Sequence, residues 1–387
     1  MKRVLSITLI VLLLMTAHAG AIIPPGPPQT ERIDRLMDGA IARGLIAGGV
    51  VVIGSSTGLL FENAYGKVSH EPGARGMTCD TLFDIASLTK VVATTPAILK
   101  LAEAGRLSLV DPVRKWFPEF AGKGKDELLV LHLLTHTSGL DDFSLPTFNP
   151  LQAAIDGAAQ EKIKGDVGSR FHYADINFIL LGELVRRVTG FSLDSYTKKQ
   201  FFEPLGMKDT GFLPGPALIP RSAPTVADSH VLLQGVVQDP TARRLGGVAG
   251  HAGLFSTAGD LALFCRMMLN NGVVGGVRVL SERAVQQMTA PYFSRGGAVV
   301  RGLGWDISSP FSSPRGNGFS PLSFGHTGYS GTSIWIDPAT DTFVVLLTSR
   351  LQYGNVKEFS QLRSDLSSLA AVLFAMPAGI QELAHYN

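Results

Sequence analysis

Apolar residues follow two different spacings along this chain. Residues 30–43 carry apolar side chains at helical spacing and are followed by Gly44, which predicts a helix that ends at a glycine. The runs 46–53 and 59–65 have β-type composition, and the turn-rich segment 54–58 between them predicts a hairpin. The pattern therefore predicts a helix that leads directly into sheet.

The middle of the chain has a mostly helical pattern, interrupted by loops rich in Gly and Pro. Helices are predicted there at residues 87–104, 130–135, 177–189, 193–202 and 257–270. Strand patterns return after Arg301, and they lie at residues 302–307, 323–328, 332–336 and 342–348. A last helix is predicted at residues 358–374.

This order of elements predicts an α+β fold. Strands from both ends of the chain form one antiparallel sheet, flanked by N- and C-terminal helices, and the segments between them form an inserted, mostly helical subdomain. We expect one domain over residues 20–387, with its sheet part at about 29–82 and 295–387 and its helical part at about 83–294.

The first residues have the three parts of a secretory signal. Lys2 and Arg3 are basic, residues 4–15 are apolar, and an Ala-x-Ala site ends at Ala19. The apolar run is shorter than the roughly 20 residues that span a bilayer, which disfavours an uncleaved membrane anchor. We expect residues 1–19 to be a cleaved signal peptide, and the mature protein to be periplasmic or secreted without a stable membrane span.

The charge balance argues against a nucleic-acid partner. The chain has 34 basic and 32 acidic residues, and loss of Lys2 and Arg3 would leave the mature protein near neutral. Cys79 and Cys265 are the only cysteines, so no Cys-x-x-Cys pair suggests zinc or redox chemistry. Two unpaired packing cysteines are expected rather than a disulfide. No cofactor is expected, and the sequence leaves the oligomeric state open.

The first segment with candidate chemistry is Ser-Leu-Thr-Lys, from Ser87 to Lys90. The two end residues are three apart at the start of a predicted helix, so the lysine amine can reach the serine hydroxyl. Unpaired N–H groups and the positive dipole end of a helix favour a developing oxyanion. Apolar neighbours would lower the pKa of Lys90 toward a role as base. The structural alternative is a helix cap followed by a surface lysine.

Two further segments contain candidate site residues. Tyr173 and Asp175 precede a predicted helix, and a phenol beside a cationic lysine can move protons. Their structural alternative is a packing tyrosine with a capping aspartate. His326, Thr327 and Gly328 lie on a predicted strand among glycines, whose backbone can approach a substrate and donate an N–H to an oxyanion. The structural alternative here is a strand edge kinked by glycine.

In this order along the chain, the three segments resemble a known family. Ser-x-x-Lys, then Tyr-x-Asn or a variant, then Lys-Thr-Gly or His-Thr-Gly are the signature of serine β-lactamases and penicillin-binding proteins. Residues 132–140 and 204–211 also resemble the class C-like branch of this superfamily, and residues 246–257 resemble the loop that walls its site. That branch includes carboxylesterases, D-amino-acid peptidases and cell-wall peptide hydrolases. The resemblance covers almost all of the mature chain.

The resemblance implies a serine hydrolase that forms an acyl-enzyme. Ser87 would attack a carbonyl, and Lys90 and Tyr173 would manage its proton. The backbone N–H groups of Ser87 and Tyr329 would form the oxyanion hole. The residues expected to contact the substrate are Asp175, His251, His326, Thr327, Gly328 and Tyr329.

Two positions depart from the family signature. Asp175 stands where many relatives have asparagine, and its carboxylate should favour the ammonium form of Lys90 and shift base duty toward Tyr173. His326 replaces the signature lysine and is mostly neutral above a pKa of about 6.5, so the site would lack a permanent cation for a substrate carboxylate. An ester or amide of a cell-wall fragment therefore fits the site at least as well as a β-lactam.

Three functions remain open on the sequence. The preferred one is an exported hydrolase of the class C β-lactamase-like type that cleaves a small-molecule or peptidoglycan-derived ester or amide. The alternatives are a penicillin-binding or sensing module that is acylated without efficient turnover, and a degenerate scaffold. His132 and His136 are four apart, but no Glu completes His-Glu-x-x-His, so no metal site is expected.

Overall fold

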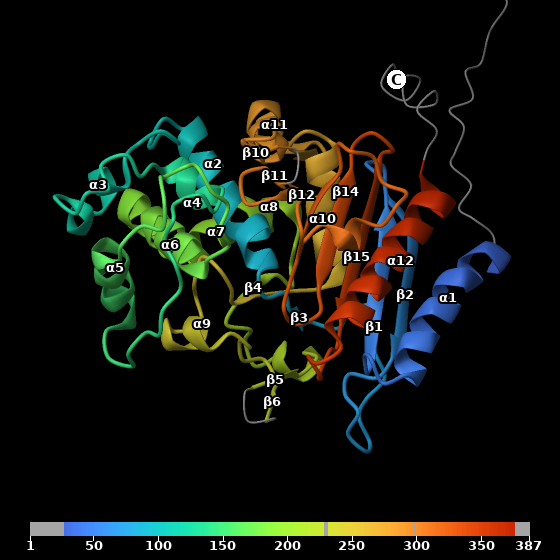
Figure 1. Cartoon of the computed structure of the whole chain (residues 1–387). Helices are drawn as coiled ribbons and strands as arrows, with labels where there is room; N and C mark the ends of the chain where they lie inside the picture. Colours follow the sequence, from blue (N-terminus) through green and yellow to red (C-terminus); the bar gives the residue numbers. More distant parts are fainter. Residues whose placement is uncertain (1–26, 228–230, 297–298, 376–387) are drawn as a thin grey trace, which may run out of the picture.

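A computed structural model describes residues 27–227, 231–296 and 299–375, so the expected signal peptide lies outside the described residues. The largest element is an eight-stranded antiparallel sheet in the order β10-β11-β12-β13-β14-β15-β1-β2 (Figure 1). Its strands are β1 (Gly48–Gly54), β2 (Leu59–Gly66), β10 (Phe293–Arg295), β11 (Val299–Arg301), β12 (Asp306–Ser308), β13 (Phe324–Thr327), β14 (Ser333–Asp337) and β15 (Thr342–Thr348). Strands from both ends of the chain thus form one sheet, which confirms the predicted α+β class.

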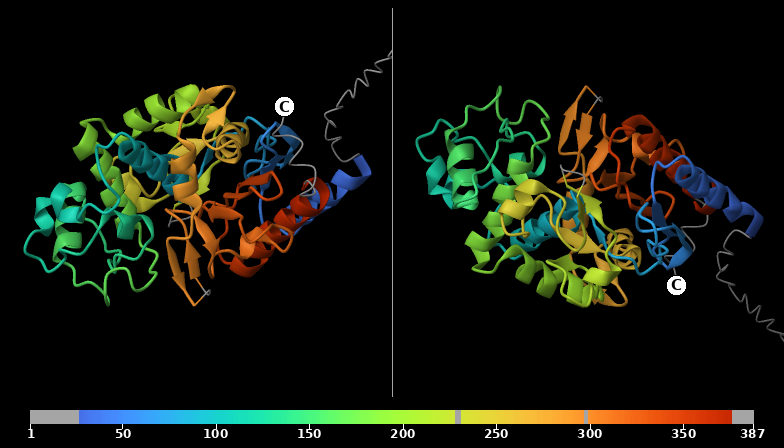
Figure 2. Two further views of the ribbon diagram at one scale, coloured as in Figure 1. Left: turned by 90° about the horizontal axis from the view of Figure 1, so that it is seen from above. Right: turned by 90° about the horizontal axis from the view of Figure 1, so that it is seen from below.

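The terminal helices cover one face of this sheet. Helix α1 (Pro27–Ala42) and helix α12 (Val356–Phe374) pack side by side there, as the views in Figure 2 show. Helix α10 (Ala258–Leu269) contacts β1 and β15 from the other face. The predicted flanking of the sheet by the first and last helices is therefore confirmed.

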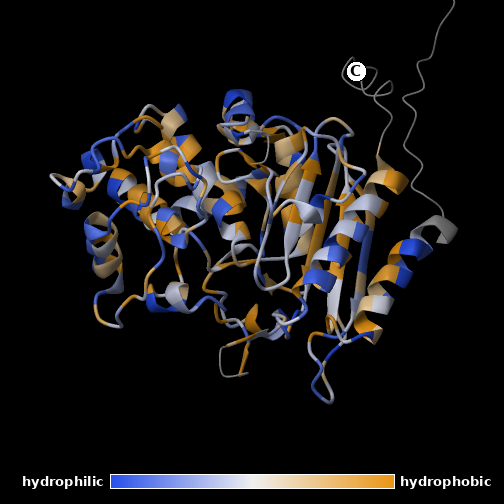
Figure 3. Cartoon of the chain, in the orientation of Figure 1, coloured by the Kyte–Doolittle hydropathy of each residue, from blue (hydrophilic) through white to orange (hydrophobic). Residues whose placement is uncertain are grey.

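Strand β1 is apolar along its whole length because the sheet is covered on both sides. Val50 and Val52 pack in the core beneath the helical part, whereas Val51 and Ile53 pack in a second core beneath α1 and α12. Successive side chains of a strand point to opposite faces, so a continuous apolar run fits a strand buried on both faces. Figure 3 shows these apolar strands inside the molecule and polar residues on the outer sides of the helices.

The helical part lies between β2 and β10 in the sequence and forms the other lobe of Figure 1. Its helices are η1 (Lys90–Thr94), α2 (Thr95–Glu103), α3 (Val113–Trp116), η2 (Pro118–Phe120), α4 (Val130–Leu134), α5 (Pro150–Gln160), α6 (Asp175–Thr189), α7 (Leu193–Thr197), η3 (Lys198–Phe202), α8 (Glu203–Leu205), η4 (Ile219–Arg221), α9 (Pro240–Arg244), α10 and α11 (Glu282–Thr289). A further short helix, η5 (Ser313–Arg315), lies between β12 and β13. Among the described helices, none is both long and apolar enough to cross a membrane.

Short strands also occur within the helical part. Strands β3 (Phe83–Asp84), β7 (Leu254–Ser256) and β4 (Gly211–Phe212) form a small sheet in that order. Two hairpins complete the set: β5 (Thr225–Val226) with β6 (Leu232–Leu233), and β8 (Val273–Val274) with β9 (Val277–Arg278). The small sheet matters for the site, because β3 leads directly into the segment that carries Ser87.

The predicted start of the strand at 302–307 is wrong. The prediction placed a strand at 302–307, but the ladder begins only at Asp306. Gly304 has a φ of +75°, and its carbonyl accepts a hydrogen bond from the Arg301 side chain at 2.9 Å. The chain therefore turns between β11 and β12 instead of continuing as one strand. Elsewhere Cys79 and Cys265 are free thiols, as predicted.

Candidate active site

Ser87 lies in a turn between β3 and the helix that follows it. Ala86, directly before the serine, has a φ of +47°, a conformation that costs a residue with a Cβ about 1–3 kcal/mol unless its surroundings fix it. Asp84 holds the turn in this conformation, because its carboxylate accepts hydrogen bonds from the N–H of Ala86 at 2.8 Å and from the N–H of Gln238 at 2.6 Å. The strained turn brings the Ser87 side chain to the wall of a cavity.

Lys90 contacts Ser87 directly. Its Nζ atom lies 3.1 Å from Ser87 Oγ, donates to the carbonyl of His251 at 3.0 Å and lies 2.7 Å from Asp175 Oδ1. Burial disfavours the charge of Lys90, but the Asp175 carboxylate, helped by Tyr173, outweighs burial and raises the pKa of Lys90 above its ordinary value. The expected lowering by apolar neighbours is therefore wrong, whereas the expected preference for the ammonium form beside Asp175 is confirmed.

Tyr173 lies beside Lys90 and precedes by two residues Asp175, where α6 begins. The centre of its ring is 5.1 Å from Lys90 Nζ. The ring stacks on buried His136, with 4.4 Å between the two ring centres. Burial above all, with nearby cations, holds the pKa of His136 well below its usual value, so this ring is neutral. The structure thus brings together Ser87, Lys90 and Tyr173, the three residues predicted to be catalytic.

His136 also has a structural role that the sequence did not indicate. It lies beyond the end of α4 with a φ of +54°, and its Nδ1 atom accepts the N–H of Ala174 at 3.3 Å. His132 instead accepts the N–H of Leu129 at 3.1 Å within the first turn of α4. The two histidines therefore serve separate hydrogen bonds and do not share a helix.

Strand β13 carries His326 and Thr327 to the opposite side of Ser87. His326 is buried, its Nδ1 atom lies 2.9 Å from the Thr327 carbonyl, and burial holds its pKa well below the usual value. A Cβ atom on Gly328 would lie 2.6 Å from the Ile85 carbonyl. Glycine is therefore required where this strand end meets the nucleophile turn.

Two backbone amides beside the cavity are free to bind an oxyanion. Within the described part of the chain, neither the Ser87 N–H nor the Tyr329 N–H donates a hydrogen bond. Both residues line the space around the serine hydroxyl. Two free donors beside a nucleophile can stabilise the negative charge of a tetrahedral intermediate.

The cavity on the His326 side is lined by three arginines. This lobe has a volume of 410 Å³ and contains Ser87 together with Arg301, Arg350 and Arg363. Each arginine is more than nine-tenths buried, and each has an Nε atom without a partner among the described residues. Of the three, Arg301 alone forms an ion pair in the described part of the chain, with Asp306 at 3.1 Å.

The arginines overturn one expectation. The sequence predicted a site without a permanent cation, because His326 replaces the signature lysine. Burial and the neighbouring Arg350 lower the pKa of Arg363 to about 9, which still leaves this guanidinium charged at neutral pH. Sequence reasoning missed Arg350 and Arg363 because neither belongs to a signature motif, and only the packing of α12 against the end of β15 brings them to the site.

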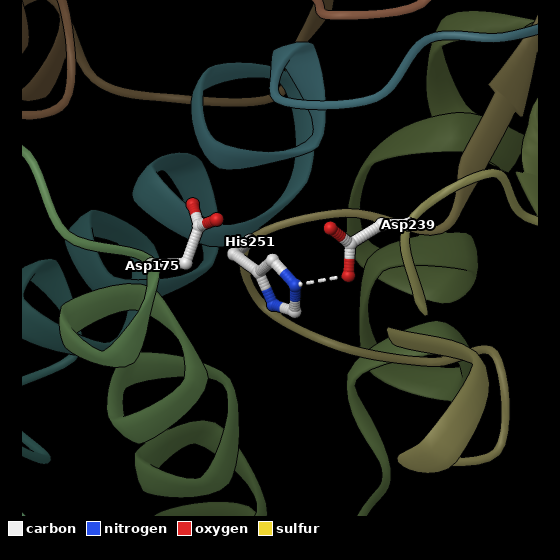
Figure 4. Close-up of side chains that lie close together, drawn as sticks. All are labelled: Asp175, Asp239 and His251. Atoms are coloured by element: carbon white, nitrogen blue, oxygen red, sulfur yellow. Dashed lines mark hydrogen bonds and ion pairs between the residues drawn. The ribbon is translucent and has the colours of Figure 1, made fainter. Parts of the chain in front are cut away.

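The lobe on the opposite side of Ser87 is acidic. It has a volume of 770 Å³, and Asp175, Asp239 and His251 line it. Figure 4 shows His251 between the two aspartates, with its Nε2 atom 2.9 Å from Asp239 Oδ1. These three side chains are the described residues that could hold a cation, although the Lys90 ammonium already contacts Asp175. Asp239 is a site residue that the sequence did not single out.

A close contact between glycines places the loop that carries His251. A Cβ atom on Gly250 would lie 2.0 Å from the Phe178 carbonyl and 3.0 Å from the Cα atom of Gly182. The loop can therefore lie directly on α6, and from there the His251 carbonyl reaches Lys90. The position of this predicted binding residue thus depends on glycine at two places far apart in the sequence.

A family model and curated relatives match most of this chain. A family model described as Beta-lactamase matches residues 33–363. A "Putative D-alanyl-D-alanine carboxypeptidase" from Salmonella agona (strain SL483) is 32% identical over 308 residues, which is 70% of each chain. A protein with the same description from Escherichia coli (strain K12) is 31% identical over 336 residues, which is 76% of each chain.

Solved structures share the fold at lower sequence identity. A penicillin-binding protein homolog from Caulobacter crescentus has a TM-score of 0.75 at 21% identity, over 90% of this chain and 98% of that chain. A class C β-lactamase has a TM-score of 0.73 at 19% identity, over 90% of this chain and 97% of that chain. The fold, the family model and the curated relatives agree, and the chain therefore belongs to the beta-lactamase family and is a serine hydrolase.

Proposed function

We propose that this protein is an exported acyl hydrolase of the class C β-lactamase-like branch, with Ser87 as its nucleophile, and that it removes a terminal residue bearing a free carboxylate from a cell-wall peptide. The observation that carries the proposal is the 3.1 Å contact between Ser87 Oγ and Lys90 Nζ, inside a cavity bordered by two free amides. Such a group of a nucleophile, proton-handling side chains and oxyanion donors fits acyl transfer.

The residues suggest a reaction in two halves. Ser87 Oγ attacks the carbonyl carbon of the scissile amide, and Tyr173, beside the charged Lys90, accepts the serine proton. The N–H groups of Ser87 and Tyr329 bind the oxyanion. Collapse of the intermediate breaks the C–N bond, and the leaving amine takes the proton from Tyr173. Water then attacks the serine ester with Tyr173 again accepting a proton, which releases the acid and restores the Ser87 hydroxyl.

The arginine-lined lobe supports a substrate with a terminal carboxylate. Removal of a C-terminal residue requires a place for its carboxylate beside the scissile bond, and Arg350 and Arg363 have no carboxylate partner among the described residues. A planar guanidinium suits a carboxylate because it can donate two parallel hydrogen bonds. The description of the curated relatives as carboxypeptidases agrees with such a substrate.

A reagent panel tests this proposal. Wild type and Ser87→Ala are incubated with a fluorophosphonate, a fluorescent penicillin, nitrocefin, a p-nitrophenyl ester and peptides ending in D-Ala-D-Ala, and the products are followed by absorbance and intact mass. Release of D-alanine by the wild type, with loss of turnover and labelling in Ser87→Ala, is the expected result. A lasting penicillin adduct without turnover of any substrate would instead favour a penicillin-binding or sensing module.

Export has its own test. When the full chain is produced in a bacterium with a secretion pathway, we expect the protein in the periplasmic or secreted fraction with Gly20 at its N-terminus. The expectation rests on the basic, apolar and small-residue parts of the first 19 residues. Cytoplasmic protein that retains Met1 would contradict it.

A further inference from the structure

The arginine-lined lobe holds more positive charge than its own residues balance. Asp306 is the one acidic side chain among the described residues that line it, and it pairs with Arg301 at 3.1 Å. Burial holds the pKa of His326 well below its usual value, so this ring is neutral. Arg350 and Arg363 form no ion pair in the described part of the chain. The lobe therefore carries two unbalanced positive charges.

Both unbalanced guanidinium groups are held by neutral partners. Their Cζ atoms lie 4.3 Å (Arg350) and 4.4 Å (Arg363) from the centre of the Phe359 ring. Arg363 Nη2 also donates to the carbonyls of Gly328 at 2.8 Å and Thr332 at 2.7 Å. Burial, together with repulsion from Arg350, lowers the pKa of Arg363 to about 9. Carbonyl groups and aromatic rings carry no net charge, so they orient the two cations without balancing them.

Each of these two guanidinium groups keeps a donor for a ligand. The side chains are 7% (Arg350) and 9% (Arg363) exposed, and both line the lobe. Within the part of the chain that the structure describes, neither Nη1 atom donates a hydrogen bond. Neither is among the buried polar atoms that lack a partner, so both Nη1 groups are open to solvent. Two largely buried cations can thus offer N–H groups to an anion in the lobe.

A ligand with a single carboxylate would balance only half of this charge. A substrate that fills the lobe displaces water from both guanidinium groups, and a buried charge that loses water without gaining a partner is costly. The lobe also has space for more than a small residue. Its volume of 410 Å³ lies in the range of about 300–1,000 Å³ that is typical of pockets for whole small molecules. Charge and volume therefore both point to a leaving residue with an anionic side chain.

We propose that the preferred leaving residue is a dicarboxylic amino acid, and that Arg350 and Arg363 together bind its α-carboxylate and its side-chain carboxylate. The inference rests on the proposed function, which places the leaving residue in this lobe. Cell-wall peptides contain glutamate, so a substrate of this kind stays within the proposed class. A peptide that ends in D-Ala-D-Ala is then a poorer substrate of the same site, because it leaves one guanidinium without a counter-charge.

Two peptides test the charge preference in the wild-type protein. N-acetyl-D-Ala-D-Glu and N-acetyl-D-Ala-D-Gln differ only in the side chain of the leaving residue, where a carboxylate is replaced by an amide of nearly equal size. We expect kcat/KM at neutral pH to favour the D-Glu peptide by about tenfold or more, because charge-assisted hydrogen bonds to the carboxylate are stronger than those to the amide. Release of the free amino acid is measured by mass spectrometry. Equal use of the two peptides, or a preference for D-Gln, would overturn the proposal.

The variant Arg350→Gln locates the effect. The Arg350 side chain donates to the Tyr353 carbonyl at 3.3 Å, whereas Arg363 also supports the turn at Gly328, so Arg350 is the less disruptive position to change. The remaining guanidinium can serve one carboxylate, and we expect the kcat/KM ratio of the D-Glu over the D-Gln peptide to fall about tenfold. Arg32→Gln, at an exposed position of α1, should keep the wild-type ratio. An unchanged ratio in Arg350→Gln, with a wild-type thermal midpoint, would contradict the assignment to this lobe.

The outcomes separate this inference from the proposed function. Release of D-alanine from N-acetyl-D-Ala-D-Ala, together with equal use of the D-Glu and D-Gln peptides, overturns the dicarboxylate preference alone. Failure of the wild type to cleave any of the three peptides, while a fluorophosphonate still labels Ser87, overturns both the carboxypeptidase function and the preference. A D-Glu preference that is lost in Arg350→Gln and kept in Arg32→Gln supports the inference.

Discussion

Lys90 Nζ and Asp175 Oδ1 lie 2.7 Å apart, and the pair joins a fully buried ammonium to a carboxylate that is 32% exposed. The lysine is therefore held in its charged form by a residue that occupies the position of the signature asparagine. A charged lysine cannot accept a proton from Ser87, so the proposed mechanism assigns this proton transfer to Tyr173.

Replacement of Asp175 should change the pH dependence of catalysis. Asp175→Asn removes the carboxylate that raises the pKa of Lys90, so the lysine should lose its proton at a lower pH. Because the charged lysine is required in the proposed mechanism, the alkaline limb of kcat/KM for an amide substrate should move down by about one to three pH units. Asp38→Asn serves as the control for loss of one negative charge. A pH profile of Asp175→Asn that superimposes on that of the wild type would show that the Lys90–Asp175 pair does not set the alkaline limb.

Arg350 should select substrates that end in a carboxylate. Arg350→Gln removes one of the two arginines that have no carboxylate partner among the described residues. We expect the kcat/KM ratio of a D-Ala-D-Ala peptide to a neutral p-nitrophenyl ester to fall about tenfold to a hundredfold, because a charge-assisted contact to the carboxylate is lost. Arg32→Gln, an exposed change of equal charge on α1, should leave the ratio at its wild-type value. Equal losses on both substrates in Arg350→Gln would point to a general disturbance of the site.

Gly328 should not tolerate a side chain. In Gly328→Ala the new Cβ atom would lie 2.1 Å from Thr332 Oγ1 and 2.6 Å from the Ile85 carbonyl. Strand β13 would have to move away from the nucleophile turn, and we expect a loss of about 1–3 kcal/mol in the free energy of unfolding together with lower turnover. Gly259→Ala, where no atom lies within 4 Å of the added carbon, provides the matched control in denaturant unfolding. A Gly328→Ala protein as stable and active as this control would refute the requirement for close approach.

Asp84 should make stability depend on pH. Burial raises its folded pKa to about 6, above an unfolded value of about 3.9. Its stabilising contribution is therefore complete below the unfolded pKa and is lost as the pH rises through the folded pKa, with a difference of about 3 kcal/mol. In Asp84→Asn a single oxygen replaces two acceptors, so one of the two backbone N–H groups loses its partner.

The prediction for Asp84 is tested by the difference in unfolding free energy between the wild type and Asp84→Asn. Unfolding free energies of wild type and Asp84→Asn are determined in urea at several pH values across the range from the unfolded to the folded pKa. We expect the variant to be less stable than the wild type. The difference in unfolding free energy should narrow as the pH rises, because only the wild type loses stability between the unfolded and the folded pKa of Asp84. A gap that stays constant or widens with pH would contradict the raised pKa.

The sequence by itself determined the local parts of the site. Ser87 and Lys90 are three residues apart, so the helical backbone alone brings their polar atoms together. The apolar runs at 46–53 and 342–348 likewise predicted strands of one sheet, and the observed strand β15 has the predicted bounds. Such features follow from side-chain periodicity, which acts over a few residues.

Only the tertiary structure decided the electrostatics around Ser87. The raised pKa of Lys90, the arginine-lined lobe and the acidic lobe each depend on residues far apart in the sequence. Arg363 reaches the site from the last helix, and Asp239 and His251 reach it through a loop laid on α6 at Gly250. Burial and charge pairing set pKa values and ligand preference, and both depend on how distant segments pack, which periodicity within a short segment does not specify.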